Sequence, residues 1–448
     1  MRWLSAILIG GLLTAGANAE GLRASTFDID VTPPLGAPLA YDDTVAHWDL
    51  GLRAKGLVLL GADEPIVLCA IDWIGIANDS YDAFREALAE AAGTSPERVA
   101  VHALHQHDAP ACDLSAEALL DEYGIEQGRY DGEFSRQTMD RLREAVAASL
   151  GDARPVTHIG AGEAEVYKVA SNRRILGEDG TVRAMRFTAT RDPELRAEPE
   201  GIIDPMLTLV SLWNEDEPIA ALSYYATHPQ SYYRTGIPNP DFPGVARFMR
   251  QLAVPQALHI HFTGAGGDIG AGKYNDGSPE NRLILAERLA DGMKRAWEQI
   301  ERTAISAKDV EWRVEPVALP PGDHLVAEEL EAALESGDAD NPMWTARALA
   351  WLRRLEAGHK VDITSLVLGP AQLLHLPAES LVAYQLAAKE MQPDRLVGVA
   401  AYGEYGAGYI GTAEAYEQGG YETSERVSRV SPAVEEVLME AIEAVMLP

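Results

Sequence analysis

The segment between residues 65 and 110 constrains the fold more than any other part of the chain. Residues 66–76 form an almost wholly apolar run, which has the length and composition of a strand covered on both faces. A helical pattern follows at about 80–92, with Asp79 or Ser80 available to cap it, and a short β-branched run at 99–104 indicates a second strand. This alternation of strand, helix and strand predicts an α/β layer arrangement whose functional site lies at strand ends.

The rest of the chain continues this alternation. We expect further strands at residues 26–34, 56–60, 155–167, 202–213, 218–226, 257–262, 361–368, 372–376 and 396–402. We expect further helices at about 133–150, 239–252, 279–302, 380–389 and 432–445. The segment 320–360 differs, because it combines a Pro-Pro-Gly turn with acidic stretches of helical periodicity, and it predicts a helical hairpin inserted on the surface.

The charge balance narrows the range of partners. The chain has 69 Asp and Glu residues against 37 Lys and Arg residues, a formal net charge of -32. Such a surface disfavours nucleic acid and anionic membrane surfaces as partners and favours solubility. Beyond the N-terminus, no segment reaches the roughly 18 uninterrupted apolar residues of a transmembrane helix, so we expect no stable membrane insertion. The sequence leaves the oligomeric state open.

The first residues have the pattern of an export signal. A basic residue at position 2 precedes the apolar run 4–13 and the small-residue site at 17–19, which predicts a secretory signal peptide spanning residues 1–19. The mature chain, 20–448, would then be periplasmic or secreted. In that environment Cys69 and Cys112 could form one disulfide, but Cys69 lies in the apolar run 66–76 and is more typical of a buried thiol.

Two histidines follow the predicted strand 99–104. Because side chains alternate along a strand, His105 and His107 should point to one side and His102 to the other. Zinc favours neutral nitrogen ligands, and the open end of a strand leaves room for water. Taken alone, the pair could equally be exposed or core histidines.

Three other positions carry residue types found in metal sites. His228 lies between a predicted strand and Pro229, which fixes the path of the chain leaving it. Glu379 follows an apolar strand and a proline, although a carboxylate there could instead serve the N-terminus of the next helix. Tyr409 lies in a glycine- and tyrosine-rich loop, where it could equally be a core or stacking aromatic.

Several other patterns point away from common enzyme classes. His259 and His261 repeat the His-x-His spacing, but inside an apolar strand, where core positions are the more typical use. The segment 267–274 comes close to a phosphate-binding loop, yet it has tyrosine where a Ser or Thr must meet magnesium. No Gly-x-Ser-x-Gly motif occurs, which weakens a serine-hydrolase interpretation.

Taken together, the motifs resemble those of the neutral/alkaline, non-lysosomal ceramidase family. They occur in the family's order between about residues 22 and 448: DIDVTPP (28–34), LHQHDAP (104–110), NR (172–173), ATHP (226–229), GGD (266–268), LPAE (376–379) and YIGTAEAYEQGGYE (409–422). The resemblance implies an α/β fold of mixed, twisted β-sheets flanked by helices, over one domain from residue 20 to 448. It also implies a zinc amidohydrolase that cleaves the N-acyl bond of ceramide into sphingosine and a fatty acid, or acts on a related lipid or small-molecule amide.

The resemblance further implies a role for each motif residue. The Zn2+ ligands of the family fall on four positions: His105, His228, Glu379 and Tyr409. Zinc held there would activate a water molecule and polarise the amide carbonyl. The remaining active-site residues of the family fall on His107, which would carry a proton to the leaving amine, and on Arg173 and Tyr421, which would stabilise the oxyanion.

The sequence departs from the family around the substrate. Asp108 and Ala109 stand where the family has serine and glycine, Arg174 and Ile175 stand where it has serine and proline, and Gly270 stands where it has serine. The chain also ends soon after the tyrosine-rich loop, so we do not expect the family's usual C-terminal β-sandwich domain. The residues that would bind the metal are retained, whereas the residues that would contact the substrate are not. The sequence therefore favours hydrolase chemistry more strongly than it favours ceramide as the substrate.

Two alternatives follow from these departures. The acidic surface and altered loops favour a hydrolase of small polar amides or esters. A different class of protein, a non-catalytic domain that keeps the metal as a structural brace and binds glycan or lipid, would have the same ligands. Nitrogen and oxygen ligands of this kind also accept divalent ions other than zinc.

Overall fold

The computed structural model describes residues 21–41 and 44–448. The predicted signal peptide, residues 1–19, lies outside the described residues and stays a prediction. Among the residues that are described, no helix has both the length and the apolar character needed to cross a membrane.

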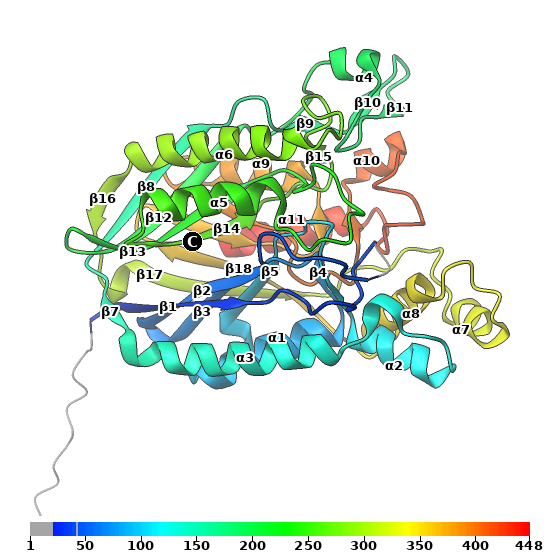
Figure 1. Ribbon diagram of the computed structural model, residues 1–448, viewed down its shortest axis with the longest axis horizontal. Coiled ribbons are helices and arrows are strands. Elements are labelled where there is room, and N and C mark those ends of the chain that lie inside the picture. Colours follow the sequence, from blue (N-terminus) through cyan, green and yellow to red (C-terminus); the bar gives the residue numbers. More distant parts are fainter. Residues whose placement is uncertain (1–20, 42–43) are drawn as a thin grey trace, which may run out of the picture.

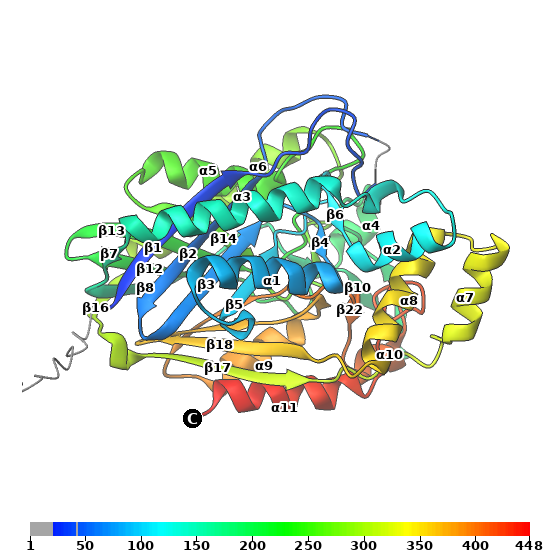
Figure 2. The ribbon, with the colours of Figure 1, turned by 90° about the horizontal axis from the view of Figure 1, so that it is seen from below.

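The first sheet confirms the strand, helix and strand unit. Its strands, in spatial order, are β5 (Val99–Ala103), β3 (Asp63–Ile71), β2 (Arg53–Gly61), β1 (Arg23–Asp30) and β7 (Arg154–Pro155). Helix α1 (Asp79–Ala92) connects β3 to β5, which pair in parallel, and it packs beside α3 (Glu133–Ser149). Figures 1 and 2 show these two helices across the outer face of the sheet.

Two local expectations in this unit were wrong. The run 66–76 is not one strand: β3 ends at Ile71, and the chain turns at Asp72, whose carboxylate is held by the buried Arg247 at 2.6 Å. The residue that precedes α1 is Asn78 rather than Asp79 or Ser80, and its side chain caps nothing in the helix because it donates to the Asp113 carboxylate at 2.8 Å.

The second and third sheets are built in the same way. The second has the order β14 (Leu258–Thr263), β13 (Glu217–Tyr225), β12 (Met206–Asn214), β8 (His158–Glu165) and β16 (Glu301–Ala304). The third has the order β17 (Val310–Val317), β18 (Val361–Leu368), β19 (Ala371–His375) and β21 (Leu396–Ala400). Parallel pairs β13–β14 and β19–β21 are each joined through a helix, namely α5 (Asp241–Ala253) and α9 (Val382–Met391). Helix α6 (Glu280–Glu298) packs beside α5, and α11 (Val434–Met446) packs on β17 and β18.

A common core lies between the three sheets. Apolar side chains of all three meet in one buried cluster, represented by Leu68 from the first sheet, Ile260 from the second and Leu373 from the third. Strands covered on both faces need apolar residues at nearly every position, which explains the apolar runs of the sequence. The expected fold class, α/β with mixed sheets flanked by helices, is thereby confirmed.

The remaining elements are short and surround one end of the sheets. They are β4 (Gly75–Ile76), β6 (Ala111–Cys112), α2 (Leu114–Glu122), β9 (Ser171–Asn172), β10 (Arg174–Leu176), β11 (Val182–Met185), α4 (Pro193–Ala197), β15 (Ile269–Gly270), β20 (Glu379–Ser380), β22 (Tyr409–Ile410) and α10 (Ala413–Gln418). Three two-stranded ladders, β4–β6, β9–β15 and β20–β22, tie loops from distant parts of the chain together at this end.

The segment 320–360 folds as two helices, α7 (Ala327–Ser336) and α8 (Pro342–Glu356). Helix α8 packs against both α7 and α2, and its Trp351 is fully buried. Its Trp344 and Arg347 line the pocket described below. The segment therefore does more than cover the surface, and its origin as an insertion stays a prediction.

Candidate metal centre and active site

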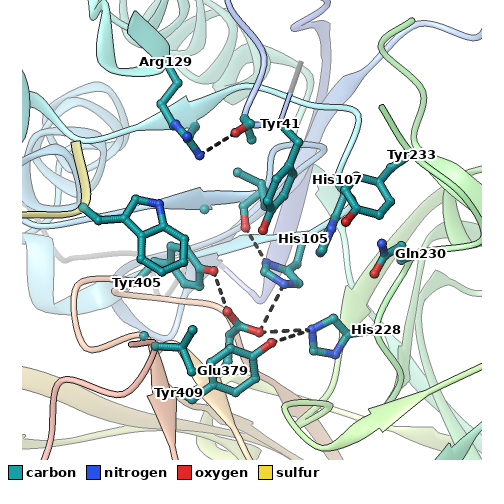
Figure 3. A pocket seen from close by; sticks show the side chains of 18 of the residues that line it. Tyr41, His105, His107, Arg129, His228, Gln230, Tyr233, Glu379, Tyr405 and Tyr409 are labelled. Atoms are coloured by element: carbon teal, nitrogen blue, oxygen red, sulfur yellow. Dashed lines mark hydrogen bonds and ion pairs between the residues drawn. The ribbon is translucent and has the colours of Figure 1, made fainter. Parts of the chain in front are cut away.

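A pocket of about 460 Å³ lies at the end of the molecule where β5, β13 and β19 stop. All seven residues singled out in the sequence line it: His105, His107, Arg173, His228, Glu379, Tyr409 and Tyr421. Figure 3 shows the histidines, Glu379 and Tyr409 pointing toward one another. The roles assigned to these residues stay predictions.

His105 reaches the pocket by a route the sequence did not predict. Strand β5 ends at Ala103, and His105 has a left-handed backbone with φ of 73°, a conformation that costs about 1–3 kcal/mol in a residue other than glycine. Its Nδ1 lies 2.6 Å from the carbonyl oxygen of Ile74, and its ring stacks on Tyr402 with centroids 4.3 Å apart. His102 points to the other side, beside Phe262, as expected.

His228 is oriented in the same way as His105, by a backbone carbonyl at its Nδ1. Its Nδ1 lies 2.7 Å from the carbonyl oxygen of Gly266. A carbonyl oxygen only accepts hydrogen bonds, so Nδ1 of both His105 and His228 carries a proton, and Nε2 is the nitrogen that can present a lone pair to the pocket when the ring is neutral. Burial, followed by the positive charge of Arg173, lowers the pKa of His228 to about 4, which keeps this ring neutral. Histidines that bind metals are fixed in this way by a carbonyl on the second nitrogen.

Glu379 lies between the two imidazoles. Its Oε2 is 3.3 Å from Nε2 of His105 and 3.1 Å from Nε2 of His228, while its Oε1 accepts a 2.5 Å hydrogen bond from the Tyr405 hydroxyl. Burial alone would raise the pKa of Glu379, but the neighbouring His105 and His228 outweigh it and hold the pKa well below its usual range. This lowering comes from positive charge on the imidazoles, so the ionised carboxylate depends on a cation, either a proton or a metal ion, between these groups.

The alternative role of Glu379 at a helix N-terminus is not what the structure shows. Helix α9 begins at Val382, and its first N–H donates to the Asp268 carboxylate at 2.9 Å. Glu379 instead pairs with Tyr409 in the parallel ladder β20–β22, which fixes both residues at the same depth. The Tyr409 hydroxyl lies 3.2 Å from Nε2 of His228.

These four donor atoms fit a zinc ion. Two imidazole lone pairs and a carboxylate oxygen at 3.1–3.3 Å repel one another unless a cation lies between them, either a proton or a metal ion. Ligands at 2.0–2.1 Å from a tetrahedral zinc are about 3.3 Å apart, which agrees with these separations. Ring nitrogens of His105, His107 and His228 also lie within 4.8 Å of one another, so His107 borders the same position.

His107 is a half-buried base whose two ring nitrogens are buried and have no partner among the described residues. Neither ring nitrogen forms a hydrogen bond with any described residue, and the ring stacks on Tyr41 with centroids 4.9 Å apart. Burial, followed by the neighbouring His105 and His228, holds the pKa of His107 well below its usual range. The ring is therefore neutral and free to accept a proton.

Arg173 supplies the positive charge beside the donor atoms. It is 3% exposed, and its Nη1 lies 3.2 Å from Nε2 of His228 and 3.3 Å from the Tyr409 hydroxyl. Its Nε pairs with the buried Glu422 at 3.3 Å. The Tyr421 ring lies under the guanidinium at 5.6 Å. Arg173 directly follows β9 of the ladder β9–β15, and its backbone N–H donates to the backbone carbonyl oxygen of Asp268 at 2.7 Å, which positions the arginine.

The substituted positions take structural roles. The carboxylate of Asp108 does not face the pocket: it accepts from the backbone of Arg234 at 2.8 Å and from the hydroxyl of Thr235 at 2.8 Å. Arg174 pairs with Glu422 at 3.2 Å, on the carboxylate that also holds Arg173. A side chain at Gly270 would lie 2.9 Å from Thr188, so no serine fits there without a shift.

The sequence did not single out Tyr402, Tyr405 or Glu422 as functional. Each acts through a contact with a residue far along the chain, and nothing in the spacing of the tyrosine-rich loop distinguishes Tyr405 from its neighbours. Both cysteines are free, buried thiols, and Cys112 lines the pocket.

One further group of possible ligands occurs among the described residues, formed by Asp82, His359 and Glu404. The guanidinium of Arg354 already lies among them, 2.8 Å from Asp82 and 3.7 Å from Glu404. It supplies the cation there, so this group is an ion-pair network. His259 and His261 belong to neither group.

The comparisons with known proteins support the fold. Neither a protein-family model nor a curated protein matches this sequence. Solved structures do match, among them a neutral ceramidase from Pseudomonas aeruginosa and a ceramidase complexed with C2, each with a TM-score of 0.67 and 16% identity over 95% of this chain. The alignments cover 74% and 75% of those chains. At this identity the likeness concerns the fold, and the chain has the fold of neutral ceramidases.

Proposed function

We propose that the protein is a zinc-dependent amidohydrolase that cleaves an N-acyl amide bond, in ceramide or a related lipid or small-molecule amide. The observation that carries this proposal is the convergence of two imidazoles, a carboxylate and a phenol on one point of a pocket. The ceramidase fold supports the same reaction class. Zinc bound there would lower the pKa of a water molecule toward about 7 and polarise the amide carbonyl.

The surrounding side chains would each perform one task. His107, neutral and without a hydrogen-bond partner, would take a proton from the attacking water and pass it to the leaving nitrogen. Arg173 and Tyr421 would bind the oxygen on which negative charge develops, a contribution of about 10²–10³ in kcat for one such donor. Tyr405 would orient the Glu379 carboxylate through its short hydrogen bond.

The test is hydrolysis of fluorogenic N-acylsphingosine and of N-acyl amino acids by the purified protein. Wild type should release fatty acid, while His105→Ala and His228→Ala should be inactive and His259→Ala, a histidine outside the pocket, should be active. Retained hydrolysis in the first two variants would contradict the proposal. Metal binding without hydrolysis of any amide or ester would instead favour a metal-braced binding domain.

We also propose that the protein is exported, on the basis of the signal-like pattern at residues 1–19. Protein recovered from the periplasm or the medium should begin at Glu20 when its N-terminus is sequenced. A retained Met1 in that fraction would contradict export by cleavage.

A further inference from the structure

The pocket is far more basic than the protein that surrounds it. Five arginines line it in addition to Arg173: Arg129, Arg234, Arg347, Arg426 and Arg429. Among the described residues, the lining includes a single carboxylate, that of Glu379. Since acidic residues outnumber basic ones by 69 to 37 in the whole chain, the balance inside the pocket is the reverse of the overall balance.

Arg347, which is half-buried, and the buried Arg429 form the inner part of this basic wall. Arg429 is 7% exposed, and its guanidinium lies 3.5 Å from the carbonyl oxygen of Gly406. Arg347 comes from α8, donates to the carbonyl oxygen of Tyr405 and lies over the Tyr405 ring at 4.2 Å. Its Nε is buried and has no partner among the described residues.

Carboxylates do not neutralise this pair. No ion pair joins either guanidinium to a carboxylate of the described residues. Their hydrogen bonds go to the carbonyl oxygens of Tyr405 and Gly406 and, from Arg347, to the side chain of Tyr130. The charge of Asp113 acts on both, but its side chain already caps α2 at 3.0 Å and accepts from Asn78 at 2.8 Å. Burial and the charge of Arg347 lower the pKa of Arg429 to about 10, as expected for two cations held close together.

A guanidinium removed from water without a carboxylate partner is costly. The hydrogen bonds seen in the structure relieve only part of that cost, because carbonyl oxygens carry no net charge. A ligand oxyanion would relieve it, and the planar guanidinium matches carboxylate, sulfonate and phosphate groups geometrically.

The basic wall also lies beside the metal centre. Tyr405 connects the two, since its ring lies under Arg347 and its hydroxyl binds Glu379. Only the Tyr405 side chain would therefore separate an oxyanion bound at Arg347 and Arg429 from the metal centre, where the scissile amide would lie.

We propose that the pocket selects N-acyl amides that carry an anionic group, and that Arg347 and Arg429 bind this oxyanion while the amide lies at the metal centre. The inference rests on the proposed amidohydrolase function and deepens it by naming the substrate class. Ceramide has no such group, so an N-acyl amino acid or a similar acidic amide is the better substrate.

The first experiment compares N-dodecanoylglycine with its neutral counterpart N-dodecanoylglycinamide. Wild type should show a kcat/KM at least tenfold higher for the anionic amide, and Arg429→Gln should reduce this ratio at least tenfold. Arg302→Gln removes an exposed arginine on β16, paired with Asp216 and outside the pocket, and should leave the ratio unchanged. Equal rates for both amides in wild type, or an unchanged ratio in Arg429→Gln, would overturn the inference while leaving the hydrolase intact.

A binding experiment separates the inference from the proposed function. Octanesulfonate and 1-octanol are titrated into the chelator-treated protein, which removes metal as a binding partner for the sulfonate. The sulfonate should bind at least tenfold more tightly than the alcohol, and Arg429→Gln should abolish the difference. This result without hydrolysis of any amide would retain the anion site and overturn the hydrolase; equal binding of the two probes would overturn the anion site.

Discussion

Removing the Tyr405 hydroxyl should weaken zinc binding without disturbing the fold. Among the described residues, this hydroxyl donates the one hydrogen bond that Oε1 of Glu379 receives, at 2.5 Å, inside a buried site. Hydrogen bonds to charged groups contribute about 1.5–3 kcal/mol. Residues that orient a metal ligand typically change metal affinity by about 10–100-fold when mutated. Tyr405→Phe should therefore raise the zinc dissociation constant by about 10–100-fold.

The ring that remains in Tyr405→Phe keeps its packing, because Arg347 lies over it at 4.2 Å and the His105 ring lies 5.5 Å away. Zinc affinity is measured by competition with a fluorescent chelator, and thermal unfolding reports on the fold. Tyr402→Phe is the matched control, since the Tyr402 hydroxyl has no hydrogen-bond partner among the described residues although its ring stacks on His105. Equal zinc affinity in wild type and Tyr405→Phe, or an equal loss in Tyr402→Phe, would refute this reasoning.

Three further predictions concern proton transfer, charge pairing and pH. His107→Ala should lower kcat by about 10²–10⁴ while the zinc content stays at the wild-type level; unchanged turnover would rule out a proton-transfer role. Glu422→Gln leaves the buried Arg173 and Arg174 unpaired and should destabilise the protein by about 3–5 kcal/mol in urea unfolding, whereas a change below 1 kcal/mol would contradict the pairing. Burial lowers the pKa of His102 to about 4, below its unfolded value, so its contribution to stability is complete above about pH 6.5 and is lost as pH falls toward 4. In urea unfolding, the free energy of unfolding of His102→Gln should therefore fall less between pH 7 and pH 5 than that of wild type. An equal fall in both proteins would contradict the assignment of this pH dependence to His102.

Much of the fold could be predicted because its strands are covered on both faces. The apolar character of β3 and the helical periodicity of α1 are local properties of the sequence, and the structure has a strand and a helix at these positions. The metal-type residues could be found for the same reason, since His105, His228 and Glu379 each follow a recognisable strand. The sheets place these strand ends together, which the sequence alone does not show.

What the sequence missed depends on contacts between distant segments. The ladder β20–β22 sets Glu379 beside Tyr409, and the hydrogen bond of Tyr405 to Glu379 depends on the path of the loop between β21 and β22. The prediction that His105 points into the site assumed a continuous strand. The strand ends before His105, and its left-handed backbone turns the side chain to the predicted side instead. The role of Arg347 was hidden because α8 was expected only to cover the surface.

Zinc stoichiometry of the purified protein and of His228→Ala, determined by elemental analysis, tests the central claim most directly. The four converging donor atoms predict one zinc ion per wild-type chain and a large loss of zinc in His228→Ala, with His259→Ala equal to wild type. A wild-type protein that takes up no zinc, or a His228→Ala variant that holds a full equivalent, would contradict the metal centre and the proposed reaction with it.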